Sequence, residues 1–172
     1  MTEKVRTVRR VDHVYIASPD PDPLLAALAE VLRLPVGWPM DDFTGFRSGG
    51  VLAGETAIEV IVFAAQARLP RDERRPAQLR GVAFEPALPE TELQVELRAR
   101  GIAFTEPESV TEKGFTWTAF GLPDFLPGQA FVFFCRYHHD EGSRRRQIVQ
   151  QSHRGDDGLG VVGLDEVVIG AS

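Results

Sequence analysis

The sequence predicts an α+β fold of two tandem βαβββ modules, followed by an extra C-terminal strand. Three observations support this prediction. The order strand, helix, strand, strand, strand occurs twice along the chain. A segment rich in proline and charge, Arg68 to Gln78, reads as an exposed linker between the two copies. The end of the chain, Leu164 to Ser172, is similar to the stretch that opens the first copy.

The first module covers about residues 10–66 and follows a charged N-terminal arm, residues 1–9. Its first strand is rich in β-branched residues, and its helix has leucines at helical spacing after a Pro/Asp turn. The strand Thr56 to Ala64 has the strongest β-propensity in the chain. The expected elements are the strand Val11 to Ala17, the helix Pro23 to Leu32, and the strands Val36 to Met40, Phe46 to Ala53 and Thr56 to Ala64.

The second module covers about residues 79–137. Its helix begins with acidic residues, ends with arginines and is followed by Gly101, which is the charge pattern and the stop signal that helices favour. The expected elements are the strand Leu79 to Glu85, the helix Glu90 to Arg100, and the strands Ile102 to Pro107, Thr116 to Phe120 and Ala130 to Tyr137.

Residues 138–172 form a polar segment and an extra strand that resembles the start of a further module. The polar part, 138–158, predicts either a mobile segment or a docked helix. In the closing strand, Asp165 matches Asp12 and Glu166 takes the place of His13. Because an unpaired apolar strand would promote aggregation, we expect it to pair with a sheet edge. Alternatively, the chain is the N-terminal half of a larger two-domain protein.

The composition excludes several classes of protein. A net charge of −6 argues against nucleic acid as a partner. No apolar run approaches the roughly 20 residues of a membrane span, and the first ten residues lack the apolar core of a signal peptide. The single cysteine, Cys135, excludes an internal disulfide framework and is typical of a reducing compartment. We therefore expect a cytoplasmic protein without a membrane partner.

Two side chains of the first module are candidates for chemistry. His13 lies near the start of an apolar strand, where an imidazole suits a general base or a metal ligand, or simply a hydrogen bond to a turn. Glu59 interrupts an apolar strand. A carboxylate that points inward there must be paired, ligating or protonated, whereas the alternative orientation turns it to solvent. We favour the inward orientation, because Ile58, Val60 and Val62 can pack under the helix on the other face.

The second module supplies candidates for a ligand pocket. Trp117, Phe133 and Cys135 belong to an aromatic-rich set that can line an apolar pocket or form ordinary core. Glu85, at a strand end, is a candidate substitute carboxylate, although a surface position before a turn is the more common outcome. The run Arg144-Arg145-Arg146 could contact an anion, but a charge run is usually a solvated face.

The two βαβββ modules, the opening motif Val-Asp-His-Val-Tyr-Ile-Ala-Ser-Pro-Asp of residues 11–20 and the strand Ala57-Ile58-Glu59-Val60 resemble the vicinal oxygen chelate superfamily. This superfamily includes glyoxalase I, extradiol dioxygenases, bleomycin-resistance proteins and methylmalonyl-CoA epimerase. The resemblance implies a divalent metal ion bound by His13 and Glu59. The third ligand position falls near Val82 and the fourth within Phe133 to Arg136, so the ligand set is incomplete. The resemblance also implies that the two modules form curled mixed sheets around a small-molecule cavity. In addition, we expect a homodimer.

These features lead to two main hypotheses and a weaker third. The first is a glyoxalase- or dioxygenase-like protein that binds a small molecule and acts as a metal-dependent lyase, isomerase or dioxygenase, with His13 and Glu59 as ligands or catalytic groups. The second is a metal-free protein that sequesters a ligand, as resistance proteins of the superfamily do. The third is a structural half of a larger two-domain protein. Whether the protein is an enzyme stays open at this point.

Overall fold

The structure is a computed structural model that describes residues 5–68, 76–125, 131–152, 161, 163–164 and 167. The chain forms two compact units, which are described separately. The unit that contains helix α1 comprises His13–Arg80 and Asp140–Ile169, and we call it the α1 unit. The other comprises Met1–Asp12, Gly81–His139 and Gly170–Ser172, and we call it the α3 unit.

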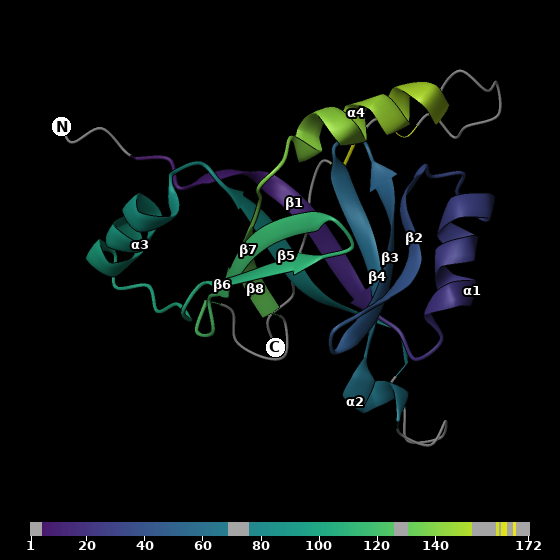
Figure 1. Ribbon diagram of the computed structural model, residues 1–172, viewed down its shortest axis with the longest axis horizontal. Coiled ribbons are helices and arrows are strands. Elements are labelled where there is room, and N and C mark those ends of the chain that lie inside the picture. Colours follow the sequence, from purple (N-terminus) through teal and green to yellow (C-terminus); the bar gives the residue numbers. More distant parts are fainter. Residues whose placement is uncertain are drawn as a thin grey trace. The chain divides into compact units, whose positions relative to one another are not determined.

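The described residues contain the doubled order of elements that the sequence predicts (Figure 1). The elements of the first copy are β1 (Val8–Ala17), α1 (Pro21–Ala26) with a π-helical segment (Ala27–Val31), β2 (Val36–Phe43), β3 (Phe46–Ala53) and β4 (Thr56–Phe63). A short helix, α2 (Ala64–Ala67), follows. The elements of the second copy are β5 (Gln78–Pro86), α3 (Glu90–Ala99), β6 (Glu108–Glu112), β7 (Phe115–Gly121) and β8 (Phe131–Tyr137). The last element is α4 (Glu141–Ser152).

Both copies build mixed sheets. In the first, the strand order is β2-β3-β4-β1, with β1 parallel to β4 and the other pairs antiparallel. In the second, the order is β5-β8-β7-β6, with β5 parallel to β8 and the other pairs antiparallel. The predicted α+β class, the βαβββ order and the mixed sheets are therefore confirmed. Within the described residues, no helix combines the length and the apolar character that crossing a bilayer requires.

Each sheet buries one face under a helix, and this fixes which side chains remain on the other face. In the α1 unit, Leu25 and Leu34 pack with Val51 and Val60 of the sheet, and Ile58 packs against the same cluster. In the α3 unit, the cluster joins residues of the helix to residues of β7 and β8 and to the residue that follows β7: Leu93, Leu97, Phe120, Val132, Phe134 and Leu122. Because successive side chains of a strand alternate between faces, residues next to these core positions point away from the helices.

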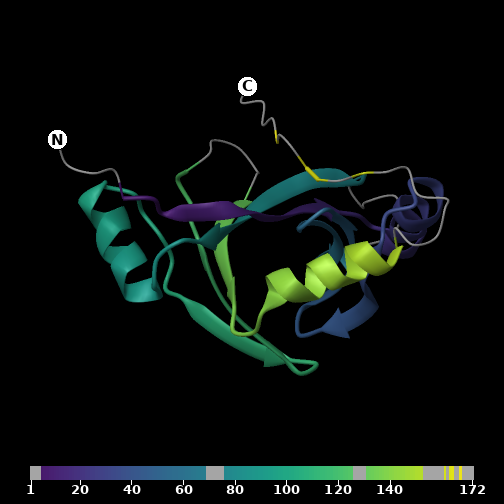
Figure 2. The same ribbon diagram turned by 90° about the horizontal axis from the view of Figure 1, so that it is seen from above.

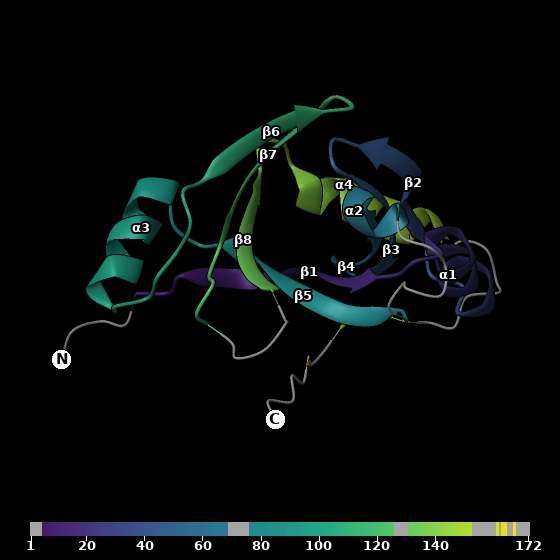
Figure 3. The same ribbon diagram turned by 90° about the horizontal axis from the view of Figure 1, so that it is seen from below.

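One predicted strand is wrong. The segment Ile102 to Pro107 is irregular, and the strand of this region is β6, Glu108–Glu112. The reason is the tight turn Lys113-Gly114, in which both residues have positive φ, 53° and 81°. Two such residues form the turn that joins twisted antiparallel strands, so Glu112 pairs with Phe115 and the hairpin extends from there (Figure 3).

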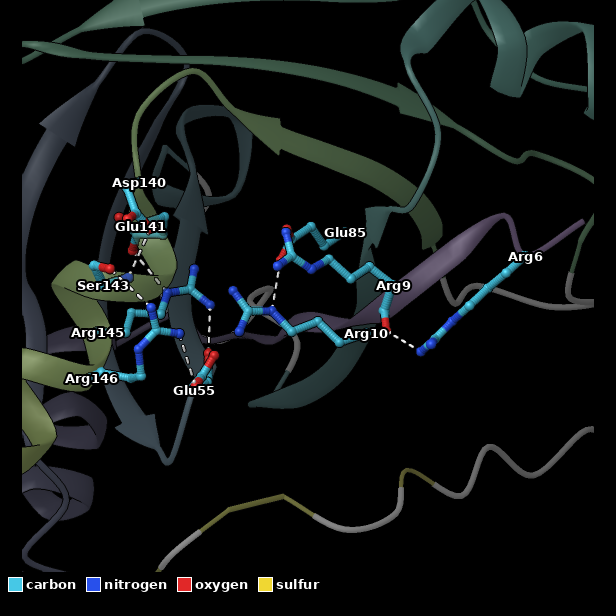
Figure 4. A network of polar contacts seen from close by, with 10 residues as sticks. All are labelled: Arg6, Arg9, Arg10, Glu55, Glu85, Asp140, Glu141, Ser143, Arg145 and Arg146. Carbon is cyan, nitrogen blue, oxygen red and sulfur yellow. Dashed lines mark hydrogen bonds and ion pairs between the residues drawn. The ribbon is translucent and has the colours of Figure 1, made fainter.

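The polar segment after β8 forms helix α4, a single straight helix of the α1 unit (Figure 2). The expectation that its arginines form a solvated face is wrong for Arg145, which is 0% exposed. Arg145 Nε donates to Glu141 Oε1 at 2.8 Å, and its Nη1 donates to the carbonyl oxygen of Glu55 at 2.9 Å (Figure 4). Arg144 also donates to both Glu141 oxygens and to the carbonyl of Gly37. The bonds to Glu141 lie within α4, and those to the carbonyl oxygens of Glu55 and Gly37 connect α4 to the rest of the α1 unit.

Most of the predicted C-terminal strand, Leu164 to Ser172, lies outside the described residues, and the two described positions, Leu164 and Val167, are not in a strand. Nearby, Val161 packs against the core of the α1 unit.

Candidate functional site

The structure brings His13 and Glu59 together on one face of the α1 unit. The two strands that carry them are parallel neighbours, with His13 opposite Ala57 and Tyr15 opposite Glu59. Because Ile58 and Val60 contribute to the core, Glu59 points to the opposite face. His13 Nε2 lies 3.4 Å from Glu59 Oε2, and the side chains are 6% and 15% exposed. The carboxylate is thus largely removed from water but still accessible.

Two further residues that sequence reasoning missed complete this cluster. The hydroxyl of Ser48 on β3 donates to Glu59 Oε1 at 2.5 Å. The indole Nε1 of Trp38 on β2 donates to Ser48 Oγ at 3.3 Å. A chain of polar contacts therefore runs across four strands, from Trp38 through Ser48 and Glu59 to His13. The only signal in the sequence is that Ser48 precedes the pair Gly49-Gly50, where a close backbone approach is expected.

Gly50 provides the space that the Trp38 ring needs. The two residues are register partners of β2 and β3, and Gly50 is in turn the partner of Glu59 on β4. A Cβ atom at Gly50 would lie 2.3 Å from the Trp38 ring, which is far inside contact distance. The absence of a side chain at Gly50 therefore lets the indole lie flat across β3 and reach Ser48.

Tyr15 is the third ionisable group on this face. It follows His13 by two residues on β1, is 8% exposed, and packs edge-to-face on Phe63. Burial raises the pKa of the Tyr15 phenol to about 12; the charge of Glu59 adds to this effect, and Arg80 opposes it. Tyr15 is therefore neutral at physiological pH and can act as a hydrogen-bond donor but not as a base.

We expect the stability of the protein to fall as the pH rises from about 10 to about 12 because of Tyr15. Its folded-state pKa of about 12 lies above the ordinary value of 10.0, so the folded state holds the proton more tightly. The stabilising contribution is complete below pH 10 and is lost as the pH rises through this window. Ultraviolet titration of tyrosinate can measure it, because the chain has only Tyr15 and Tyr137. In Tyr15→Phe the late titration step should disappear; its persistence would assign the step to Tyr137.

Among the residues that the structure describes, those at the expected positions do not fit a catalytic metal centre. Such centres usually have three protein ligands, and His13 and Glu59 supply two. In the part of the chain that the structure describes, no three His, Cys, Asp or Glu side chains form a group that would hold a metal ion. The expected third position, Val82, pairs with Val132 of the core, and the expected fourth offers only the buried thiol of Cys135.

The candidate pocket residues of the second module share one face of β7 and β8. Trp117 pairs with Tyr137, Ala119 with Cys135, and Gly121 with Phe133. These residues alternate with Phe120 and Phe134, which lie in the core, so they point away from α3. The Phe133 ring stacks on Phe131 at 5.3 Å, and Cys135 is 3% exposed. This face of the α3 unit is therefore aromatic, as an apolar ligand would require.

Glu85 is already engaged and is not a substitute for the missing carboxylate. It accepts from Arg10 Nε at 2.6 Å and from Arg9 Nη1 at 2.9 Å, all within the α3 unit (Figure 4). The histidines after β8 also have partners. His138 Nε2 lies 2.8 Å from Thr118 Oγ1, and the His139 ring packs against Phe115 and Tyr137.

The sequence matches no family model and no curated protein, but the fold matches solved structures. Methylmalonyl-CoA epimerase from Mycobacterium tuberculosis aligns with a TM-score of 0.59 at 13% identity, over 78% of this chain and 91% of that one. Another methylmalonyl-CoA epimerase aligns with a TM-score of 0.60 at 16% identity, over 79% of this chain and all (100%) of that one. A variant of the Streptomyces coelicolor epimerase, in complex with 2-nitronate-propionyl-CoA, aligns with a TM-score of 0.57 at 13% identity, over 77% and 100% of the two chains. At these identities the likeness is one of fold.

Proposed function

We propose, from the premise that this chain has the fold of the vicinal oxygen chelate superfamily, that it is a small-molecule-binding enzyme that transfers a proton at a carbon next to a carbonyl group. One observation carries the proposal. The Glu59 carboxylate is held by Ser48 at 2.5 Å and by His13 at 3.4 Å, on the sheet face opposite the helix-packed core. A positioned carboxylate beside an imidazole is a typical arrangement for general acid–base catalysis.

The chemistry requires only the residues of this cluster. Glu59 accepts the proton from the carbon, and the electron pair of the broken C–H bond moves to the carbonyl oxygen of the substrate. A donor on the same face, His13 or the neutral phenol of Tyr15, stabilises the enolate through a hydrogen bond. Return of the proton to the same or a neighbouring atom gives an epimerase or an isomerase. Loss of a leaving group from the enolate gives a lyase.

The ligand class follows from the fold neighbours and from the aromatic face of the α3 unit. Several neighbours are methylmalonyl-CoA epimerases, and one of these is in complex with 2-nitronate-propionyl-CoA. We propose that Trp117, Phe133 and Cys135 form an apolar ligand-binding surface of the α3 unit. A cytoplasmic location agrees with a single, buried cysteine, and the homodimer stays a prediction.

A second candidate is a metal-free protein that sequesters an aromatic ligand without altering it. The observation that favours it is the combination of a two-member donor set, His13 and Glu59, with an aromatic sheet face. In that function Glu59 and His13 would serve as hydrogen-bond partners of the ligand and not as a base and its companion.

Exchange of substrate hydrogen with solvent tests the proposal directly. Untagged protein is incubated in D₂O with methylmalonyl-CoA, and deuterium at C2 is followed by mass spectrometry, with and without a metal chelator. We expect enzyme-dependent exchange that survives chelation. Saturable ligand binding without exchange would favour sequestration. Exchange that is lost on chelation and restored by a divalent ion would instead establish a metal-dependent enzyme.

A further inference from the structure

We propose that Trp38 and Ser48 form a one-way hydrogen-bond chain that orients Glu59, so that only its Oε2 oxygen exchanges a proton. Ser48 is then a positioning residue of the site: it acts through Glu59 and does not touch the substrate. The inference rests on the proposed function of Glu59 as a base. The inference goes further than that function because it identifies the carboxylate oxygen that reacts and the residues that select this oxygen.

The direction of the chain follows from the chemistry of its members. An indole N–H can only donate, so Trp38 Nε1 donates to Ser48 Oγ across 3.3 Å. A serine hydroxyl has one proton, and that proton is directed to Glu59 Oε1 at 2.5 Å. Oε1 is therefore engaged as an acceptor in the resting site. Oε2 is the oxygen that faces His13 Nε2, at 3.4 Å, and it is the one left for proton uptake.

Burial and packing hold this chain in place. Ser48 is 1% exposed, so water does not compete for its hydroxyl. The Trp38 ring lies across Gly50, where a Cβ would approach to 2.3 Å, and Gly50 pairs with Glu59. The residue before Trp38, Gly37, is bound through its carbonyl oxygen by Arg144 of α4 at 2.8 Å. The pairing of the strand backbone, the packing of the indole ring over Gly50 and the bond from α4 thus each restrict the position of the Trp38 N–H donor.

The groups that surround Glu59 keep the direction of the chain unambiguous. From β1, the carboxylate faces His13 and Tyr15, and Tyr15 also experiences the charge of Arg80 on β5. From β3 it faces Ser48 and Gly50, and β2 contributes Trp38 through Ser48. Serine, glycine and tryptophan do not titrate near neutral pH, so the hydrogen-bond chain from Trp38 through Ser48 keeps its direction over that range.

Kinetics of serine variants test the positioning role. In Ser48→Ala we expect the kcat of the C2 exchange reaction to fall about 10- to 100-fold, as is typical when a group that orients a reactive residue is lost, with KM changed less than about 3-fold. Ser48→Thr retains the hydroxyl and should recover most of the rate. Ser18→Ala is the matched control, because Ser18 is also buried in the α1 unit, at 3%, and has no role in the chain. Equal kcat in wild type and Ser48→Ala would overturn the proposal.

A measurement without substrate separates this inference from the proposed function. The chain has two tryptophans, so ¹⁵N-labelled protein gives two indole N–H signals, and Trp117 serves as the internal reference. We expect Ser48→Ala to shift the Trp38 signal and to accelerate its hydrogen exchange about 10-fold or more, without affecting Trp117. If the Trp38 signal is unchanged in Ser48→Ala, the chain does not exist. If it responds as expected while wild type exchanges no substrate hydrogen, the chain stands and the proposed reaction is wrong.

Discussion

Replacing Arg145 with methionine is expected to lower the free energy of unfolding by about 3 kcal/mol, one of the two largest effects that the structure predicts. Arg145 is 0% exposed and binds both the Glu141 carboxylate and the carbonyl oxygen of Glu55. Removing one partner of a buried charged pair leaves polar groups in a dry environment, and their desolvation is then no longer offset. Methionine nearly preserves the side-chain length, so the decrease in the free energy of unfolding reflects the lost hydrogen bonds more than the creation of a cavity.

Arg146→Met is the matched control for this prediction. Arg146 is adjacent on the same helix, and its ion pair with Glu55 at 3.2 Å is 50% exposed on the arginine side. An exposed pair contributes little, so we expect a change below about 0.5 kcal/mol. Urea denaturation measures the global effect, and hydrogen exchange of the α4 amides shows whether the helix undocks before the rest unfolds. Similar losses in the two variants would mean that burial of Arg145 does not determine the docking of α4.

The doubled βαβββ order and the orientation of Glu59 could be predicted because both depend on local patterns, whereas the proximity of His13 to Glu59 was expected only from the family resemblance. Alternation along Thr56–Phe63 assigns Ile58 and Val60 to one face and Glu59 to the other, whatever the rest of the fold does. The resemblance of the opening motif then places His13 on the neighbouring strand. For such elements, the alternation of side chains along a strand and the residues that mark turns are enough to support the prediction.

Ser48, Trp38 and Arg145 could not be assigned in this way, because their roles depend on contacts between segments far apart in the chain. A serine before two glycines has no chemical signature until β3 is paired in register with β4. Three consecutive arginines normally indicate a solvated face, and the burial of Arg145 appears only when the Glu55 carbonyl is placed against α4. For the metal, the superfamily pattern specifies four ligand positions, and the sequence by itself already places donors at only two of them, His13 and Glu59.

Glu59→Gln is expected to reduce the kcat of the proposed proton transfer by about 100- to 10,000-fold, the range that general-base catalysis supplies. Glutamine has the same shape, and its amide oxygen can still accept the hydrogen bond from Ser48, so the fold and the Trp38 contact should be retained. The amide cannot take up a proton at neutral pH. The variant therefore removes the base and leaves its surroundings intact, and ligand affinity should change only a few-fold.

Glu85→Gln is the matched control for this last prediction. The two carboxylates are similarly exposed, 15% for Glu59 and 19% for Glu85, but Glu85 is paired with Arg9 and Arg10 in the α3 unit. We expect Glu85→Gln to exchange the C2 hydrogen at the wild-type rate. The comparison separates loss of the base from a general effect of removing a half-buried negative charge. Exchange in Glu59→Gln within about twofold of wild type would show that another group removes the proton. His13, whose Nε2 lies 3.4 Å from Glu59 Oε2, would then be the next residue to replace, as His13→Gln.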